Sequence, residues 1–151
     1  MEAGSAYTRS LPVGCRQCRQ GSKMVLLVTG RCRSGCFYCP LSKAKRGKDV
    51  IFADELAVDE PEEVLNEARL IKAKGTGITG GDPLEELDMV LDLIRLLKST
   101  FGEGHHVHLY TATMDRAAFH ALQGAGLDEL RLHPPLRHWK RMGKSGLEEA
   151  V

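Results

Sequence analysis

The sequence predicts an α/β fold in which parallel strands alternate with helices. Short apolar runs of strand length alternate with longer segments whose apolar residues recur at helical spacing, and glycine or proline separates them. A strand followed by a helix and then by another strand requires parallel pairing with right-handed crossovers. With 151 residues, 42% hydrophobic and 27% charged, the chain is long enough for one domain with its own core.

The first strand is expected at Met24 to Val28, a continuous apolar run typical of a strand buried on both faces. A basic loop separates this strand from the first helix. Asp59 is expected to cap that helix together with Glu62, three residues later, and Gly75 to end it. The buried side of the helix is predicted from apolar residues at helical spacing, which are Val64, Leu65, Ala68 and Ile71.

The second strand is expected at Gly75 to Gly81, with a glycine-rich end. Asp82 then resembles an N-cap residue, because Pro83 follows at the position where a helix tolerates proline best. A single apolar stripe predicts that this second helix continues to Gly102. The stripe consists of Leu87, Val90, Leu91, Ile94, Leu97 and Phe101.

Two further strands and one helix complete the predicted order. Strands are expected at His106 to Thr111 and at Glu129 to His133, with a helix from Asp115 to Gly124 between them. Ser145 to Glu148 has the pattern of a capping box that begins a fourth helix, and two residues follow it. The predicted fold is therefore truncated after about four strands.

The charge balance predicts no general attraction to nucleic acid or to an anionic membrane. Lys and Arg number 21 against 20 Asp and Glu, for a net charge of +1. The first residues lack the apolar core of a signal peptide, and the longest apolar run is too short to span a bilayer. We therefore expect a cytoplasmic protein with no membrane partner. Since thiols stay reduced there, its five cysteines, all between positions 15 and 39, are interpreted as metal ligands.

Three of these cysteines, Cys32, Cys36 and Cys39, lie in one short loop directly after the first strand. The carboxyl ends of parallel strands present such loops to ligands. Cysteine thiolates, usually four, hold iron–sulfur clusters. Three thiolates would leave one iron with an open coordination site, which a metal needs to bind a reactant.

The spacing CxxxCxxC with an aromatic residue, Tyr38, before the last cysteine resembles the signature of the radical S-adenosylmethionine (SAM) superfamily. The resemblance implies a partial (β/α) barrel that holds a [4Fe-4S] cluster and SAM. It further implies that Cys32, Cys36 and Cys39 ligate the cluster and that Tyr38 lies against the adenine. The open iron would bind the amino and carboxylate groups of SAM. Reductive cleavage would then give methionine and a 5′-deoxyadenosyl radical that abstracts hydrogen from an unknown substrate.

Thr79 to Pro83 resembles the GGEP element of the same superfamily, with aspartate in place of glutamate. The resemblance implies that Gly80, Gly81 and Asp82 bind the methionyl ammonium of SAM. Glycines permit close approach of the backbone, and a carboxylate accepts a charge-assisted hydrogen bond. Aspartate is one methylene shorter than glutamate and reaches less far. The resemblance also implies further SAM contacts at the end of the third strand, from Thr111 and Thr113.

The wider pattern, from Cys15 to about Pro134, resembles an uncharacterised radical SAM family related to the activating enzyme of pyruvate formate-lyase. On this interpretation residues 23–151 are the amino-terminal part of the radical SAM core. Residues 1–22 are an extension that carries Cys15 and Cys18. These two cysteines could bind an auxiliary metal, act as a redox pair or be two reduced thiols.

Two alternatives remain at this point. Cys15, Cys18, Cys36 and Cys39 also have the spacing of a zinc-ribbon, which would make the protein a structural or interaction module. Against this, a ribbon needs hairpins between its cysteine pairs, and it would leave Cys32 unexplained. The second alternative is a cluster-binding fragment that another polypeptide completes.

Polar and aliphatic residues alternate in the third and fourth strands, whereas strands covered on both faces are usually apolar throughout. If the aliphatic residues pack on helices, the others line the lumen of the barrel near the SAM site. They could bind SAM or substrate, or they could form a buried hydrogen-bonded network. These candidates are His106, His108, Tyr110, Glu129, Arg131 and His133.

A basic run, Lys43, Lys45, Arg46 and Lys48, follows the cysteine loop. Most such runs are solvated surface. The more specific hypothesis is a docking patch for an acidic electron donor such as a flavodoxin or ferredoxin.

Overall fold

The computed structural model describes residues 10–136, and the fourth helix predicted at Ser145 lies outside this range. In chain order the elements are α1 (Val13–Arg19), β1 (Lys23–Leu27), β2 (Ile51–Ala53), β3 (Leu56–Val58), α2 (Pro61–Leu70), β4 (Gly75–Thr79), the 3₁₀ turn η2 (Pro83–Glu86), α3 (Leu87–Phe101), β5 (His106–Thr111), α4 (Arg116–Gly124) and β6 (Glu129–Leu132).

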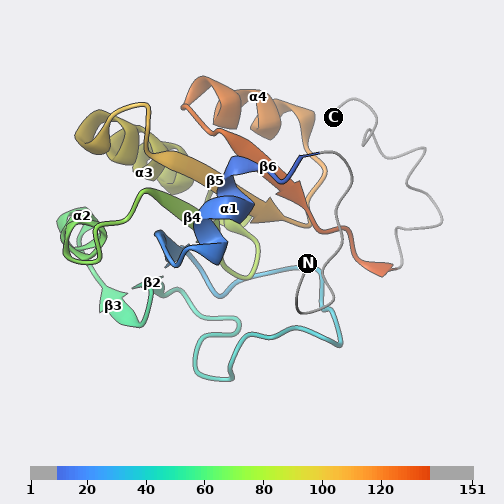
Figure 1. Cartoon of the computed structure of the whole chain (residues 1–151). Coiled ribbons are helices and arrows are strands. Elements are labelled where there is room, and N and C mark those ends of the chain that lie inside the picture. Colours follow the sequence, from blue (N-terminus) through green and yellow to red (C-terminus); the bar gives the residue numbers. More distant parts are fainter. Residues whose placement is uncertain (1–9, 137–151) are drawn as a thin grey trace.

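One open six-stranded sheet, in the order β3-β2-β1-β4-β5-β6, organises the chain (Figure 1). β1, β4, β5 and β6 run parallel, while β2 and β3 form an antiparallel hairpin beside β1. The predicted α/β class with parallel strands is therefore confirmed. Each of the four predicted strands is found within two residues of its expected bounds.

The hairpin of β2 and β3 was not predicted from the sequence. Both strands are only three residues long, so neither shows a periodic pattern. Asp54 forms the turn between them with a positive φ of 51°. Its carboxylate accepts a hydrogen bond from the backbone N–H of Val25 at 2.8 Å, and its own N–H donates to the carbonyl oxygen of Val25 at 2.7 Å. The hairpin is thus joined to β1 by a side chain as well as by the strand ladder.

The start and end predicted for α2 were wrong by small amounts. The N-cap is Glu60 and not Asp59, and the capping box pairs Glu60 with Glu63 rather than Asp59 with Glu62. Pro61 decides this, because its fixed φ suits the first helical position and its missing N–H costs nothing there. The helix ends at Leu70, and Lys72, with a φ of 54°, turns the chain before Gly75.

The helices α2, α3 and α4 cover one face of the sheet, and α1 lies on the other (Figure 1). The core between sheet and helices is apolar and fully buried, with Leu26, Ile78, Val107 and Leu109 from the strands and Val90, Ile94, Leu97 and Leu122 from the helices. As expected, β1 is buried on both faces, except at one residue. The side chain of Val25 is 49% exposed, because it points to the face that α1 covers only in part.

The helix α1 was also missed, since its N-cap, Pro12, makes no side-chain cap and only Gly14 within it is buried. It therefore lacks the apolar stripe that identifies an amphipathic helix. Gly14 lies so close to the sheet that a Cβ atom there would be 2.6 Å from Oε2 of Glu129 and 2.9 Å from Cε1 of His106. Within residues 10–136 no helix is both long enough and apolar enough to cross a membrane.

Candidate functional site

The cysteine loop begins where β1 ends, and a second loop holds it there. The backbone N–H of Gly30 donates to the carbonyl oxygen of Lys48 at 2.9 Å, and Gly47 donates to the carbonyl oxygen of Gly30 at 2.7 Å. A Cβ atom on Gly30 would clash with the backbone of Lys45. The basic loop after the cysteines thus folds back onto the point where the cysteine loop leaves the sheet, and only glycine fits there.

The glycine element at the end of β4 lies directly beside this point. The backbone N–H of Gly81 donates to the carbonyl oxygen of Thr29 at 2.7 Å, and that of Asp82 donates to the carbonyl oxygen of Arg31 at 2.8 Å. A Cβ atom on Gly80 would be 2.6 Å from the carbonyl oxygen of Thr29. The two sequence motifs, separated by about forty residues, are therefore joined backbone to backbone.

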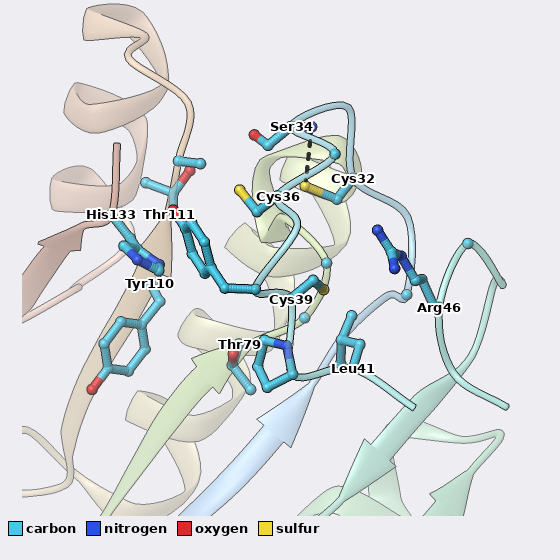
Figure 2. A pocket seen from close by; sticks show the side chains of 18 residues that line it. Cys32, Ser34, Cys36, Cys39, Leu41, Arg46, Thr79, Tyr110, Thr111 and His133 are labelled. Atoms are coloured by element: carbon cyan, nitrogen blue, oxygen red, sulfur yellow. Dashed lines mark hydrogen bonds between the residues drawn. The ribbon is translucent and has the colours of Figure 1, made fainter. Parts of the chain in front are cut away.

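A pocket of about 410 Å³ opens between the two motifs (Figure 2). This volume lies in the range of small-molecule and cofactor sites. Figure 2 shows the cysteines on the loop above the ends of the strands, with Thr111 and His133 across from them. The predicted site residues that line the pocket are Cys32, Cys36, Tyr38, Cys39, Gly80, Gly81, Tyr110, Thr111 and His133.

None of the three loop cysteines is engaged in a disulfide. Cys32 is exposed, and its Sγ accepts a hydrogen bond from the backbone N–H of Ser34 at 3.3 Å (Figure 2). Cys36 and Cys39 are half-buried. Within residues 10–136 no three His, Cys, Asp or Glu side chains already converge on one point as metal ligands do. The donor set, three free thiols on one loop at one pocket, nevertheless fits an iron–sulfur cluster by its chemistry.

Tyr38 lies at the pocket beside Cys36 and His133. A side-chain hydrogen bond with Cys36 raises the pKa of the Tyr38 phenol. The rings of Tyr38 and His133 are 5.9 Å apart, centroid to centroid. An aromatic platform is thereby present next to the thiols, which suits stacking against a planar ring system.

Asp82 does not extend into the pocket, although its neighbours Gly80 and Gly81 line it. The residue is only 2% exposed. Its Oδ1 accepts hydrogen bonds from the N–H of Leu84 at 3.2 Å and from the hydroxyl of Thr111 at 2.7 Å. Its Oδ2 accepts from the N–H of Ala112 at 3.2 Å and from the hydroxyl of Thr113 at 2.8 Å. Two carboxylate oxygens offer about four lone-pair sites, so these bonds use the whole capacity of the group.

Asp82 therefore joins the end of β4 to the end of β5, and we call it with Thr111 and Thr113 the Asp82 clasp. The sequence suggested all three residues, but as separate ligands of SAM. That they bond to one another could not be foreseen, because about thirty residues separate the aspartate from the threonines.

Two ion pairs that were not predicted from the sequence link the cysteine loop to η2. Arg33 pairs with Glu85 at 3.1 Å, and Arg31 pairs with Glu86. Both arginines are largely exposed, so each pair contributes at most about 1 kcal/mol. Their effect is to restrain the loop near the helix that follows the glycine element.

The polar residues predicted to line the lumen do share one face of β5 and β6, opposite the buried Val107 and Leu109. Tyr110 and His133 reach the pocket. The amino-terminal parts of β5 and β6 carry His106, His108 and Glu129. There Gly14 of α1 packs against His106 and Glu129. The set is thus divided between the pocket and a region beneath α1.

Lys23, which was not among the predicted site residues, is at the centre of the region beneath α1. Its Nζ lies 2.7 Å from Nδ1 of His108, 2.9 Å from Nδ1 of His106 and 3.2 Å from the carbonyl oxygen of Thr76. Burial lowers the pKa of Lys23 to about 8. The ammonium group of Lys23 donates hydrogen bonds to both ring nitrogens, which favours the neutral form of His106 and His108. These contacts favour the network interpretation for His106 and His108.

Because His105 and His108 are buried, we predict that acid destabilises the fold. Burial, assisted by the charge of Lys23, lowers the pKa of His105 to about 4 and that of His108 to about 3, from 6.5. The unfolded chain therefore binds more protons than the folded one below pH 6.5, and stability falls as the pH falls. Between pH 7 and pH 5 the free energy of unfolding should drop by roughly 4 kcal/mol. Lys23 stays protonated in both states over this range.

Urea denaturation at pH 7, 6 and 5 measures this dependence. His105→Asn keeps a polar partner for the hydroxyl of Thr76, which lies 2.9 Å from Nε2 of His105, and removes one titrating group. It should roughly halve the drop. His120→Asn, at an exposed position of α4, should leave the dependence unchanged. Equal unfolding free energies of the unmodified chain at pH 7 and pH 5 would refute the prediction.

Cys15 and Cys18 lie on α1, away from the loop cysteines. Gln17, between them, donates from Nε2 to the carbonyl oxygen of Lys74 at 3.3 Å, just before β4 begins. Cys36 and Cys39 lie at the pocket beyond the end of β4, which is about 13 Å long. The zinc-ribbon alternative is therefore wrong for this fold. Its four cysteines belong to a helix and to a loop at different levels of the sheet, and none lies on a hairpin.

The residues of the basic run lie in three different surroundings. The Nζ of Lys45 lies 4.0 Å from the centroid of the Phe52 ring and pairs with Glu55 at 3.7 Å. Arg46 lines the pocket. Lys43 and Lys48 are exposed beside the cysteine loop. The two exposed lysines are thus the part of the run that is available to a partner.

Comparison with known proteins gives two matches of interest. A sequence model of the radical SAM superfamily matches residues 26–135, which include both motifs. A protein of Methanocaldococcus jannaschii that is named "Putative glycyl-radical enzyme activating enzyme" is 46% identical over 126 residues, which are 82% of this chain and 33% of that protein. The chain thus spans about a third of the length of this curated relative. No solved structure matches the chain.

Proposed function

The chain belongs to the radical SAM superfamily, and on this basis we propose that it binds a [4Fe-4S] cluster and SAM in the pocket between its two motifs. The observation that carries the proposal is the convergence of the cysteine loop and the glycine element on one pocket. The proposed reaction is reductive cleavage of SAM, followed by hydrogen abstraction from an organic substrate. Residues 23–151 would form the core of this activity, in the reducing environment of the cytoplasm.

The cluster ligands in this proposal are Cys32, Cys36 and Cys39. All three are free thiols at the pocket, and the loop that carries them is held by Gly30 and by the ion pair of Arg33. Cleavage of SAM to methionine and a 5′-deoxyadenosyl radical is the chemistry that the cluster supplies when it is bound.

The remaining pocket residues would position SAM. Gly80 and Gly81 allow a ligand to approach the backbone, and Tyr38 offers a ring for the adenine. Asp82 would favour the methionyl ammonium by its negative charge from within the clasp, since the hydrogen-bonding capacity of the carboxylate is already used. Thr111 and Thr113 would act through Asp82. Tyr110 and His133 border the side from which a substrate would approach.

The proposed electron donor is a small acidic protein such as a flavodoxin or ferredoxin. Lys43 and Lys48 are exposed next to the cysteine loop and would attract it. The name of the M. jannaschii relative suggests a glycine residue of a protein as one class of substrate.

The test is reconstitution with iron and sulfide in the absence of oxygen, followed by spectroscopy. We expect visible absorption of an iron–sulfur cluster, and a paramagnetic resonance signal on reduction that changes when SAM is added. Formation of 5′-deoxyadenosine after reduction by dithionite or by a reduced flavodoxin measures cleavage. These readouts require the cysteine loop and the glycine element to work as one site.

Other results would contradict the proposal in different ways. A colourless chain that retains zinc would exclude the cluster. A cluster that does not respond to SAM would show that the chain is a cluster-binding fragment, which another polypeptide completes.

A further inference from the structure

The helix α1 places two thiols on one side, three residues apart. In an α-helix the Cα atoms of residues i and i+3 are separated by about 5 Å, given the rise and radius of the helix. This separation lies within the range found for disulfide-bonded cysteines. Cys18 is exposed and Cys15 is half-buried. One thiol of the pair is therefore accessible to a reagent, and the other is close enough to react with it.

Arg131 contacts the inner thiol. Its Nη2 donates to Sγ of Cys15 at 3.3 Å, while its Nε donates to Oε1 of Glu129 at 2.7 Å and its Nη1 to the hydroxyl of Tyr110. This contact places a positive charge directly beside the sulfur of Cys15. The ammonium of Lys23 is a second positive charge, within electrostatic range of Cys18. Each thiol thus has a cation nearby, and the carboxylate of Glu129 pairs with the cation beside Cys15.

The helix can adjust to a covalent bond between its cysteines. In a regular helix the Cβ atoms of residues i and i+3 are farther apart than a relaxed disulfide requires, so the turn must deform. α1 has only seven residues, and Gly14 is the only buried residue in it. Deforming this short helix therefore disturbs little of the core, and the resulting bond would be strained and readily reduced.

We propose that Cys15 and Cys18 form a dithiol–disulfide redox site that is separate from the three loop cysteines. The thiolate of Cys18 attacks one sulfur of an incoming disulfide, which forms a mixed disulfide and releases one thiol. The thiolate of Cys15 then attacks Sγ of Cys18 and releases the second thiol. The two protein thiols lose two electrons, and the incoming disulfide is reduced to two thiols.

Arg131 connects this redox site to the pocket. The same guanidinium bonds to Cys15 and to Tyr110, and Tyr110 lines the pocket. In the disulfide the sulfur of Cys15 must move toward that of Cys18, so its contact with Nη2 of Arg131 changes, and with it the surroundings of Tyr110. Oxidation of the two cysteines therefore changes the pocket at Tyr110, whether or not a cluster is bound there.

The experiment equilibrates the full chain, without iron and without oxygen, in buffers of reduced and oxidised glutathione. The free thiols are then alkylated and the chain is cut with trypsin. Trypsin cleaves after Arg9, Arg16 and Arg19, which places Cys15 in residues 10–16 and Cys18 in residues 17–19. The expected product at oxidising ratios is these two peptides joined by a disulfide. In a Cys32→Ser, Cys36→Ser, Cys39→Ser variant the same linked pair should form, since the loop thiols are not needed.

Single variants assign the role of each residue. Cys15→Ser should accumulate glutathione on Cys18, because nothing resolves the mixed disulfide, while Cys18→Ser should react far more slowly. Arg131→Met removes the hydrogen bond that the reduced pair receives at Sγ of Cys15, so the disulfide should become about tenfold more favourable, or about 30 mV more reducing. Arg116→Met, an exposed arginine on α4, is the matched control and should leave the equilibrium unchanged. The intrinsic fluorescence of Tyr110 should differ between the oxidised and reduced forms of the triple variant, and a Tyr110→Phe control removes that difference.

Three results would overturn the proposal. Cys15 and Cys18 could both remain open to alkylation at the most oxidising ratio. The linked peptides could instead join Cys15 or Cys18 to a loop cysteine. Finally, a zinc ion that protects both thiols and is lost in Cys15→Ser and Cys18→Ser would identify them as metal ligands. None of these results bears on the cluster itself, which the reconstitution experiment tests.

Discussion

Replacing any one of Cys32, Cys36 and Cys39 by alanine is expected to abolish retention of the cluster. A four-iron cluster held by three protein thiolates has no spare ligand, so removal of one leaves a second iron exposed to solvent. Iron bound after reconstitution and desalting should fall from about four per chain to well under one. Iron and sulfide analysis with visible absorption measures the loss. Since Cys32 is exposed and the other two are half-buried, the fold should persist in all three variants.

The matched controls are Cys15→Ala and Cys18→Ala. These variants change the same residue type on α1 and should retain a full complement of iron. Loss of iron in either would mean that the α1 thiols take part in holding it, and the assignment of three ligands would be wrong. Circular dichroism of each variant separates loss of the cluster from loss of the fold.

Asp82→Ala is expected to lower the free energy of unfolding by about 4 kcal/mol. The carboxylate is buried and accepts four hydrogen bonds, and its removal leaves the hydroxyl of Thr111 and the N–H of Ala112 without an acceptor. Each buried group that loses a bond to a charged partner costs about 1.5–3 kcal/mol, and the losses are not additive. Urea denaturation of the iron-free chain measures the change without reference to any cofactor.

Asp82→Asn tests whether the charge or the shape of the carboxylate stabilises the fold. The amide keeps one oxygen acceptor, but its NH₂ group faces the N–H of Ala112 or that of Leu84, so we expect a loss of about 2 kcal/mol. Asp88→Ala, an exposed acidic residue in the first turn of α3, should change stability by less than about 1 kcal/mol. Stability of Asp82→Ala equal to that of Asp88→Ala would show that the clasp contributes nothing.

The parts of the fold that the sequence predicts are those with long apolar patterns. The stripe of α3 and the alternation in β5 each continue over several turns or residues, and the core they form decides their conformation. The sequence does not predict β2 and β3, whose pairing depends on contacts with β1, nor α1, in which a glycine is the only buried residue. In these segments tertiary contacts, rather than local patterns, determine the structure.

The candidate site divides in a similar way. Motif spacing predicts that the cysteine loop and the glycine element lie together, because both follow parallel strands that end at the same edge. It does not predict the hydrogen bonds of Asp82 with Thr111 or the contact of Lys23 with His108, since these partners are distant in the sequence. Asp82 as part of a SAM motif suggests a ligand, whereas in the structure all its hydrogen bonds are internal.

The clasp has a consequence for the energetics of ligand binding. Gly80 and Gly81 are fixed from one side by the backbone of Thr29 and Arg31, and from the other by the bonds of Asp82 to the end of β5. A turn that is already ordered loses little conformational entropy when a ligand arrives. The three thiols of the cysteine loop do not yet converge on one point, so their rearrangement is what would still oppose binding. The affinity of the pocket should therefore be limited by that loop, while the glycine turn acts as a rigid template.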